Sequence, residues 1–249
     1  MSIINLLKCE SLQESKEEFR KVIQKAVDEN DGPYFTVGLS GGGLPAILAE
    51  VLPSIQTDWQ KWRFFFCDER LVSFSDPEST FGAYRSIVVP KIPDISLNQF
   101  ITIDPTLNSW AAAYDYLSKM KQVFSRNVEI DFPRFDLLFL GMGPDGHTCS
   151  LFPGRPALNE TKRWIAYVGD SPKPPPNRIT MTLPVLNNAK YCVFFVAGAT
   201  KAQVVKDIVV DGKQLPGGMV IPKNGELYWI LDNESAKLLP EEYLKKMAV

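Results

Sequence analysis

The residues of this sequence best suited to chemistry are its only histidine, His147, and the carboxylate two positions before it, Asp145. An imidazole has an unperturbed pKa of about 6.5, so near neutral pH it can take a proton from water and later return it. A carboxylate two residues away can fix the tautomer of the ring or raise its basicity. We therefore predict that His147 is the centre of proton transfer and that Asp145 orients it.

This pair stands on a glycine-rich turn that follows a buried strand. Residues 135–140 are mostly apolar, lie after Pro133 and are followed by the glycines of residues 141–146. Such a run is typical of a strand that is buried on both faces in a parallel sheet. Ligands of open α/β sheets bind just outside the carboxyl ends of the strands, so the turn is expected at a binding site.

The same turn matches the dinucleotide fingerprint G-x-G-x-x-G at residues 141–146. That fingerprint needs a full helix to follow, so that the helix N-terminus faces the pyrophosphate. Pro153 and Gly154 come too soon after His147 for a regular helix, and Asp145 would put negative charge beside the phosphates. A non-catalytic dinucleotide-binding module is therefore kept only as an alternative.

A second candidate site follows the strand predicted at residues 34–39. Ser40, Gly41 and Gly42 lead from that strand into a helix predicted to begin at residue 44, with a proline in its first turn. Glycines let backbone N–H groups converge on an anion, and the helix N-terminus adds roughly half a positive charge. The Gly-Lys-Ser/Thr of a Walker loop is absent from the sequence, so the pattern favours a simpler phosphate group over a nucleoside triphosphate.

Charged residues also follow other predicted strands. Asp68 and Arg70 come directly after the strand at residues 62–67, and Arg70 could offer a planar fork to a phosphate or carboxylate. The proline-rich stretch at residues 171–176 is interpreted as a stiff loop that presents Lys173, with an interdomain linker as the alternative.

Two further basic residues complete the set. Arg178 begins a segment that alternates with period two, and Lys201 stands between a strand at 191–197 and a helix at 202–209. Cations gathered around a glycine-rich helix start indicate a phosphorylated small molecule as the ligand. With no second histidine to build the usual ligand set, we expect no metal and no cofactor.

Bulk properties exclude several other classes. The net charge of −2 gives no support for a nucleic-acid or acidic-membrane partner. The four cysteines are scattered, without metal-ligand spacing, and we expect them to be reduced. We find neither a signal-peptide pattern nor an apolar run of membrane-spanning length. We expect a cytoplasmic monomer.

Strand and helix patterns alternate along the chain, which predicts one α/β domain over residues 1–249. Its architecture is expected to be Rossmann-like: one continuous, mainly parallel sheet with helices on both faces. A short strand is predicted at residues 100–103. The helix at residues 110–124 is expected to turn Trp110, Tyr114, Leu117, Met120 (or Lys121) and Phe124 toward the core.

Taken together, these motifs resemble the 6-phosphogluconolactonase family across essentially the whole chain. The resemblance is carried by the strings Ser40-Gly41-Gly42, Asp68-Glu69-Arg70, Asp145-Gly-His147-Thr-x-Ser-Leu-Phe-Pro-Gly154, Ser171-Pro-Lys-Pro-Pro175 and Arg178-Ile-Thr180. The related glucosamine-6-phosphate deaminases share Asp-Gly-His but continue with an Ala-Phe-Asn-Glu-Pro-like run. Two positions depart from the family pattern: Ser73 stands where proline is frequent, and Thr80 where asparagine is frequent.

The resemblance implies hydrolysis of 6-phospho-D-glucono-1,5-lactone to 6-phosphogluconate, the second step of the oxidative pentose phosphate pathway. His147 would be the general base on water and then protonate the leaving ring oxygen, with Asp145 orienting the ring. Backbone N–H groups of a glycine-rich turn, or Arg70, would stabilise the oxyanion.

The phosphate of this small phosphosugar lactone would be bound by Ser40, Gly41 and Gly42 together with Arg178 and Lys201, with Lys173 close by. The nearest alternative is a deaminase or isomerase of aminosugar phosphates that uses a base such as Asp68. A weaker one is a Cys149 nucleophile.

Overall fold

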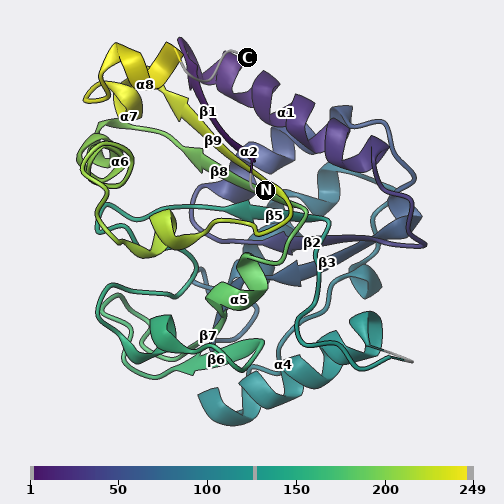
Figure 1. The fold of residues 1–249 in the computed structure, drawn as a ribbon. Helices are drawn as coiled ribbons and strands as arrows, with labels where there is room; N and C mark the ends of the chain where they lie inside the picture. The colour runs from purple at the N-terminus through teal and green to yellow at the C-terminus, as the bar shows by residue number, and fades with distance from the viewer. Residues whose placement is uncertain (1–2, 126–127, 246–249) are drawn as a thin grey trace.

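The computed structural model describes residues 3–125 and 128–245, which fold around a parallel sheet of six strands (Figure 1). Its strand order is β1-β9-β8-β5-β2-β3, and every paired neighbour is parallel. The strands are β1 (Ile3–Cys9), β2 (Phe35–Leu39), β3 (Trp62–Phe66), β5 (Leu137–Leu140), β8 (Tyr191–Val196) and β9 (Glu226–Asp232). The predicted mainly parallel, Rossmann-like sheet is confirmed.

The expectation of one continuous sheet is wrong. A second, antiparallel sheet has the order β4-β7-β6 and consists of β4 (Asp68–Arg70), β7 (Arg178–Met181) and β6 (Ile165–Val168). Cys67 joins the two sheets, because its N–H donates to Leu39 of β2 while its carbonyl accepts from Met181 of β7. The chain therefore leaves the large sheet at the point where β3 ends and the polar residues begin.

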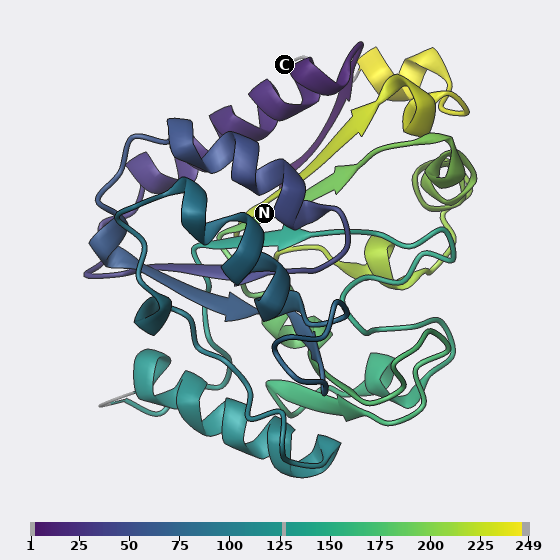
Figure 2. The same ribbon diagram turned by 180° about the vertical axis from the view of Figure 1, so that it is seen from behind.

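Helices cover the large sheet on both faces. In Figure 2, α2 (Leu44–Val51) and α3 (Thr80–Ile87) lie together in front of the strands, and Figure 1 shows α5 (Leu183–Leu186) on the opposite face. The other helices are α1 (Leu12–Asp28), α4 (Ser109–Phe124), α6 (Ala202–Val209), α7 (Asn233–Ala236) and α8 (Glu241–Lys245). The buried apolar side chains form one cluster that includes residues of both sheets. Within the described ranges, no helix is long and apolar enough to cross a membrane.

Helix α4 packs under the small sheet, against β6, and only part of its predicted core-facing set is confirmed. Trp110 and Tyr114 are 62% and 68% exposed, and their rings stack on each other in solvent. Met120 is buried as predicted, and Leu117 and Phe124 are partly buried against the core. The helix also buries Ala112, Ala113 and Tyr116, which were not predicted. Apolar residues lie on most sides of this helix, so its pattern alone could not select the packed face; the two alanines permit the closer approach.

The strand predicted at residues 100–103 is also wrong. Only Phe100 forms an isolated parallel bridge, to Phe64, before the chain continues as a loop. The Phe100 ring stacks on the Phe64 ring with centroids 4.5 Å apart. This segment is therefore apolar because it packs on the edge of the large sheet, not because it forms a ladder.

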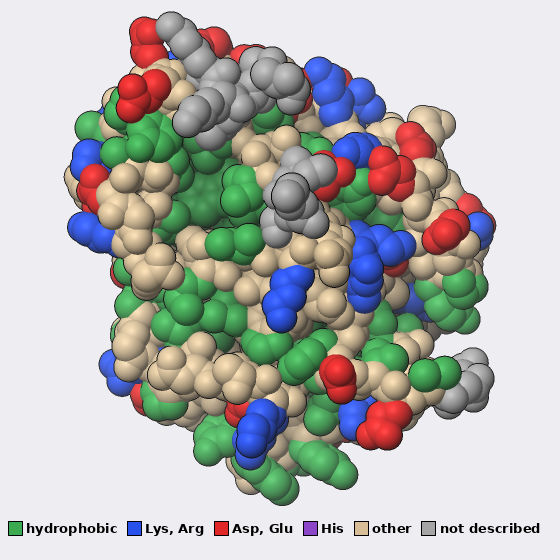
Figure 3. Space-filling model, in the orientation of Figure 1, with side chains coloured by type: hydrophobic (Ala, Val, Ile, Leu, Met, Phe, Trp, Pro, Cys, Tyr) green, Lys and Arg blue, Asp and Glu red, His purple; other side chains and the backbone are tan. Residues whose placement is uncertain are grey.

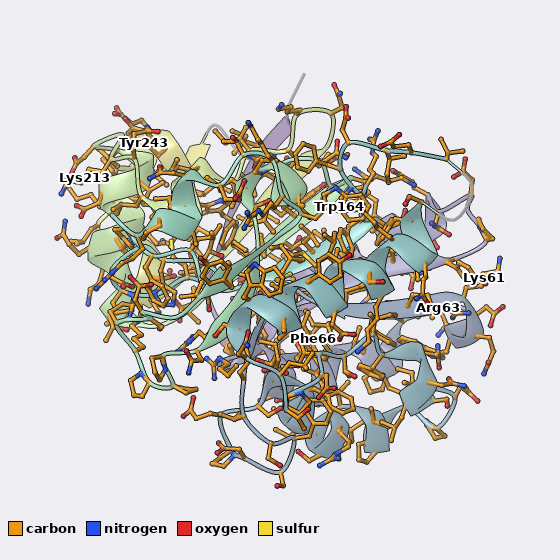
Figure 4. All side chains as sticks on the ribbon, turned by 90° about the horizontal axis from the view of Figure 1, so that it is seen from below. Lys61, Arg63, Phe66, Trp164, Lys213 and Tyr243 are labelled. Carbon is orange, nitrogen blue, oxygen red and sulfur yellow. The ribbon has the colours of Figure 1, made fainter. Side chains whose placement is uncertain are left out.

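The strand order explains where the site lies. Strand β5 runs between β2 and β8, so the turns that follow these three strands are neighbours at the carboxyl edge of the sheet. In Figure 4, Lys61 and Arg63, at the start of β3, lie on one side of the molecule, and Lys213 lies on the opposite side. Leu215, close to Lys213 in sequence, is the residue that a side chain at Gly146 would strike. The carboxyl edge of the sheet thus faces the Lys213 side.

Candidate active site

A cavity of about 650 Å³ opens at the carboxyl edge of the parallel sheet. It brings together nine of the ten predicted site residues. These are Ser40, Gly41, Gly42, Asp68, Arg70, His147, Lys173, Arg178 and Lys201. The tenth, Asp145, is hydrogen-bonded to His147 but does not itself line the cavity.

The Asp145–His147 pair is formed within one turn. His147 Nδ1 lies 2.5 Å from Asp145 Oδ1, and because an ionised carboxylate only accepts, this ring nitrogen carries the proton. The lone pair on Nε2 is then free to act as a base. The imidazole also stacks on Phe152, with ring centroids 4.6 Å apart and planes at 28°. The ring is therefore held by a hydrogen bond at Nδ1 and by stacking on one of its faces.

The turn can bring these side chains together only because two of its residues are glycines. Gly143 donates its N–H to the carbonyl of His147, and a Cβ at Gly143 would overlap both the imidazole and the Asp145 carboxylate. Gly146 has φ +79°, a backbone conformation that favours glycine, and a side chain there would strike Leu215. Gly143 was not among the predicted site residues, although its place in the Gly-x-Gly-Pro-Asp-Gly string was visible.

The surroundings of His147 favour its neutral form. Burial lowers the pKa of the imidazole below its ordinary value, although the hydrogen bond and charge of Asp145 oppose that shift; the Lys173 charge adds to the lowering. Burial opposes ionisation of Asp145, yet the hydrogen bond and charge of His147, together with Lys173, lower its pKa. A neutral imidazole beside an ionised carboxylate is the state that a general base requires.

Lys173 lies closer to this pair than the sequence indicated. Its Nζ is 3.3 Å from His147 Nδ1 and 3.5 Å from Asp145 Oδ1. Arg178, which was expected to bind phosphate, is buried and donates to three carbonyls of the proline-rich loop, those of Lys173, Pro174 and Pro175. Arg178 lines the cavity, but most of its donors hold the loop that carries Lys173.

The glycine-rich turn after β2 is a candidate anion cradle at the start of α2. Gly42 has φ +71°, and the Tyr84 hydroxyl donates to the Ser40 carbonyl at 2.9 Å, which fixes the turn. Ser40 Oγ and Arg70 Nε are buried and have no hydrogen-bond partner among the described residues. Buried donors without partners are costly, so an anion that reaches them would be bound strongly.

The buried carboxylate of Glu69 holds the backbone next to this cradle. Glu69 accepts hydrogen bonds from the N–H groups of Arg70, Thr80 and Phe81, and so caps the first turn of α3. Burial raises the pKa of Glu69 to about 7. Glu69 was not among the predicted site residues, because the helix that it caps begins eleven residues later in the chain.

Asp68 and Cys149 also lie at the cavity. Asp68 is buried and accepts a hydrogen bond of 2.7 Å from Ser150 Oγ. A hydrogen bond with Cys67, together with burial, raises the pKa of the Cys149 thiol well above its ordinary value. A thiol held in its protonated form is a poor nucleophile, so the arrangement disfavours the Cys149 alternative.

These features are those of one class of protein: an α/β enzyme whose sheet edge presents a candidate proton-transfer pair beside a candidate anion cradle. Within the described ranges, no group of three His, Cys, Asp or Glu residues is placed to hold a metal ion. The face shown in Figure 3 carries basic and acidic side chains scattered among apolar and uncharged ones, without a continuous basic surface.

The family model of glucosamine-6-phosphate isomerases/6-phosphogluconolactonase matches residues 8–229, and the chain belongs to this family. It is 47% identical to a 6-phosphogluconolactonase of Rattus norvegicus over 232 residues, which are 90% of this chain and 89% of the relative. It is 46% identical to a 6-phosphogluconolactonase of Homo sapiens over 85% of this chain and 83% of the relative.

Solved structures agree with this assignment. The crystal structure of 6-phosphogluconolactonase from Leishmania guyanensis is similar with a TM-score of 0.81 and 26% sequence identity. That match covers 95% of this chain and 98% of the other. The predicted family and fold are confirmed.

Proposed function

We propose that this chain hydrolyses 6-phospho-D-glucono-1,5-lactone to 6-phospho-D-gluconate, the second step of the oxidative pentose phosphate pathway. The observation that carries the proposal is the Asp145–His147 pair at the cavity of a chain 47% identical to a 6-phosphogluconolactonase. The enzyme is a carboxylic ester hydrolase, and its substrate is a small phosphosugar lactone.

The first chemical step is the attack of water on the lactone carbonyl. Nε2 of neutral His147 takes a proton from the water as its oxygen bonds to the carbonyl carbon, and the carbonyl oxygen becomes an oxyanion. Asp145 accepts from Nδ1–H throughout, which stabilises the imidazolium as it forms. Backbone N–H groups of a glycine-rich turn, or the Arg70 guanidinium, stabilise the oxyanion.

The second step breaks the ester. The tetrahedral intermediate collapses, the bond between the carbonyl carbon and the ring oxygen breaks, and His147 returns its proton to that oxygen. The open-chain acid then loses a proton to solvent, and His147 is again neutral. One water is consumed and no redox change occurs.

Binding of the phosphate group holds the lactone in place for this reaction. The cradle of Ser40, Gly41 and Gly42, with Lys201 and Arg70 at the same cavity, supplies N–H groups and positive charge. Burial lowers the pKa of Lys201, so a phosphate that pairs with it also relieves a buried charge. Binding energy from this remote group orients the carbonyl against His147.

The test is acid release from freshly generated phosphogluconolactone, corrected for spontaneous hydrolysis in buffer. We expect a rate that is proportional to enzyme and lost in His147→Ala. A rate no greater than that of buffer alone would refute the proposal. Release of ammonia from glucosamine 6-phosphate would instead identify the deaminase alternative, and thermal stabilisation by NAD(P) would identify the dinucleotide-binding one.

The same proposal includes a cytoplasmic location and a monomeric state. Both are expectations from the sequence, and cell fractionation and light scattering of the untagged protein test them. A stable dimer in dilute solution would contradict the second.

A further inference from the structure

The proline-rich loop brings one ammonium ion against the proton-transfer pair. Lys173 Nζ is within 3.5 Å of both Asp145 Oδ1 and His147 Nδ1, although 26 positions separate this lysine from the histidine in the chain. The Nδ1 proton already goes to Asp145, so Lys173 pairs with the carboxylate and places its positive charge beside the ring. That charge opposes a second proton on the imidazole.

Arg178 holds Lys173 in this place. Its Nε donates to the Pro175 carbonyl at 3.0 Å, and its Nη2 donates to the Lys173 and Pro174 carbonyls at 2.9 and 3.1 Å. Arg178 is only 2% exposed and lies on β7, whose partner β4 carries Asp68. A rigid strand thus clamps the backbone of the loop at the residue that reaches His147.

We propose that Lys173 is a positioning residue of the hydrolytic reaction: it holds the Asp145 carboxylate and keeps the His147 ring uncharged until the ring takes a proton from water, and Arg178 serves it by clamping the loop. This inference rests on the proposed lactonase activity. It gives Lys173 a role at the reacting end of the lactone, separate from contact with the phosphate.

Other charged groups also face the Asp145–His147 pair, and they decide which control variants the experiment needs. Asp68 on β4 acts on His147 in the direction opposite to Lys173, and Lys201, before α6, lies within the electrostatic influence of Lys173 and Asp145. The guanidinium of Arg178 lies 5.8 Å from the Phe152 ring on which His147 stacks. The remaining ionisable groups at the cavity are Arg70, Glu78 and Cys149. Lys201 is the matched control, because it is a lysine of the same cavity without a contact to His147 among the described residues.

His147 is the only histidine in the chain, so its ring protons can be followed by NMR without assignment. The experiment titrates untagged wild type, Lys173→Met, Lys173→Arg and Lys201→Met in buffer free of phosphate and sulfate. Lys173→Met should raise the His147 pKa by about 0.5–1 unit, and the acid limb of kcat/KM should move up equally. Lys173→Arg and Lys201→Met should each stay within about 0.3 unit of wild type, because each keeps a cation beside the pair.

Three results would overturn the inference. The first is a Lys173→Met variant in which the His147 pKa is unchanged and only KM rises, because Lys173 would then be only a substrate contact. The second is an equal shift in Lys173→Arg, because a disturbed loop and not the charge would be the cause. The third is an equal shift in Lys201→Met. Wild type without lactonase activity would instead refute the proposed function, while the NMR titration still reports on Lys173.

Discussion

The space above the Cα of Gly143 is occupied by the imidazole of His147, so that a methyl group at position 143 and the observed ring cannot coexist. The position of the His147 ring therefore depends on a glycine at position 143. A hydrogen bond of 2.9 Å from the Gly143 N–H to the His147 carbonyl also joins the two residues. The glycine-rich string that resembles a dinucleotide fingerprint has another purpose here. It lets an Asp–His hydrogen bond form within one turn.

Gly143→Ala should therefore disable the reaction without unfolding the protein. The added methyl group must push the His147 ring out of place, and we expect kcat to fall about 100-fold or more, as misplaced catalytic groups do. Kinetics at saturating lactone measure this effect, with Gly169→Ala as the control, because the nearest atom to a Cβ at Gly169 is 3.8 Å away. Near-normal kcat in Gly143→Ala would contradict this steric account.

His147→Ala should lower kcat by about two to four orders of magnitude, the usual share of general acid–base catalysis. Substrate binding should survive, because the anion cradle lies on a different turn. Comparing kcat with product affinity separates the two effects. A variant that keeps near-full turnover would exclude His147 as the base.

The pH dependence should follow the lowered pKa of His147. The active form is the neutral imidazole, and burial shifts its protonation to lower pH. The midpoint of the acid limb should therefore lie below the ordinary histidine pKa of about 6.5. The acid limb of kcat/KM measures this, after subtraction of spontaneous hydrolysis. An acid limb whose apparent pKa lies above the ordinary histidine value would mean that the imidazolium is the stabilised form.

Lys201→Ala and Arg178→Ala should differ, although both residues line the cavity. Loss of Lys201 removes one charge-assisted phosphate contact, so KM should rise about 10- to 100-fold while kcat changes little. Loss of Arg178 frees three loop carbonyls and moves Lys173, so kcat should fall as well as KM rise. Steady-state kinetics of the two variants decide the matter. Identical KM-only effects would return Arg178 to the role of a simple phosphate ligand.

Glu69→Gln should destabilise the protein, with a characteristic pH dependence. An amide cannot accept from both N–H groups of the first turn of α3 as the carboxyl does. The folded-state pKa of Glu69 is raised to about 7, so the stability gained from its protonation is fully present below its ordinary value and lost as pH rises.

Urea unfolding at about pH 4.5 and about pH 7.5 measures the advantage of wild type over Glu69→Gln. That advantage should shrink with rising pH by about 1–3 kcal/mol. An advantage that grows with pH would mean that the Glu69 carboxylate is stabilised in its ionised form. Asp104→Asn is a matched control, because Asp104 bonds only within its own exposed turn and its pKa is lowered.

Much of the fold and of the site followed from local patterns in the sequence. The parallel strands could be predicted because strands that are buried on both faces are continuous apolar runs in the sequence. Each glycine-rich turn marked the end of the strand before it. His147, Asp145 and the Ser40–Gly42 turn could be selected for the same reason: the residues that make each of these units are neighbours in the chain.

Only the tertiary structure decided which groups that are far apart in the sequence come into contact. It divided the strands between two sheets at Cys67, turned Trp110 and Tyr114 outward, and brought Lys173 to the Asp145–His147 pair. It also made Arg178 the clamp of a loop and Glu69 the cap of α3. Residue type and spacing determine hydrogen bonds within a turn. The partner of a long charged side chain depends instead on which strands pair and which loops cross, and that is set by packing of the whole chain.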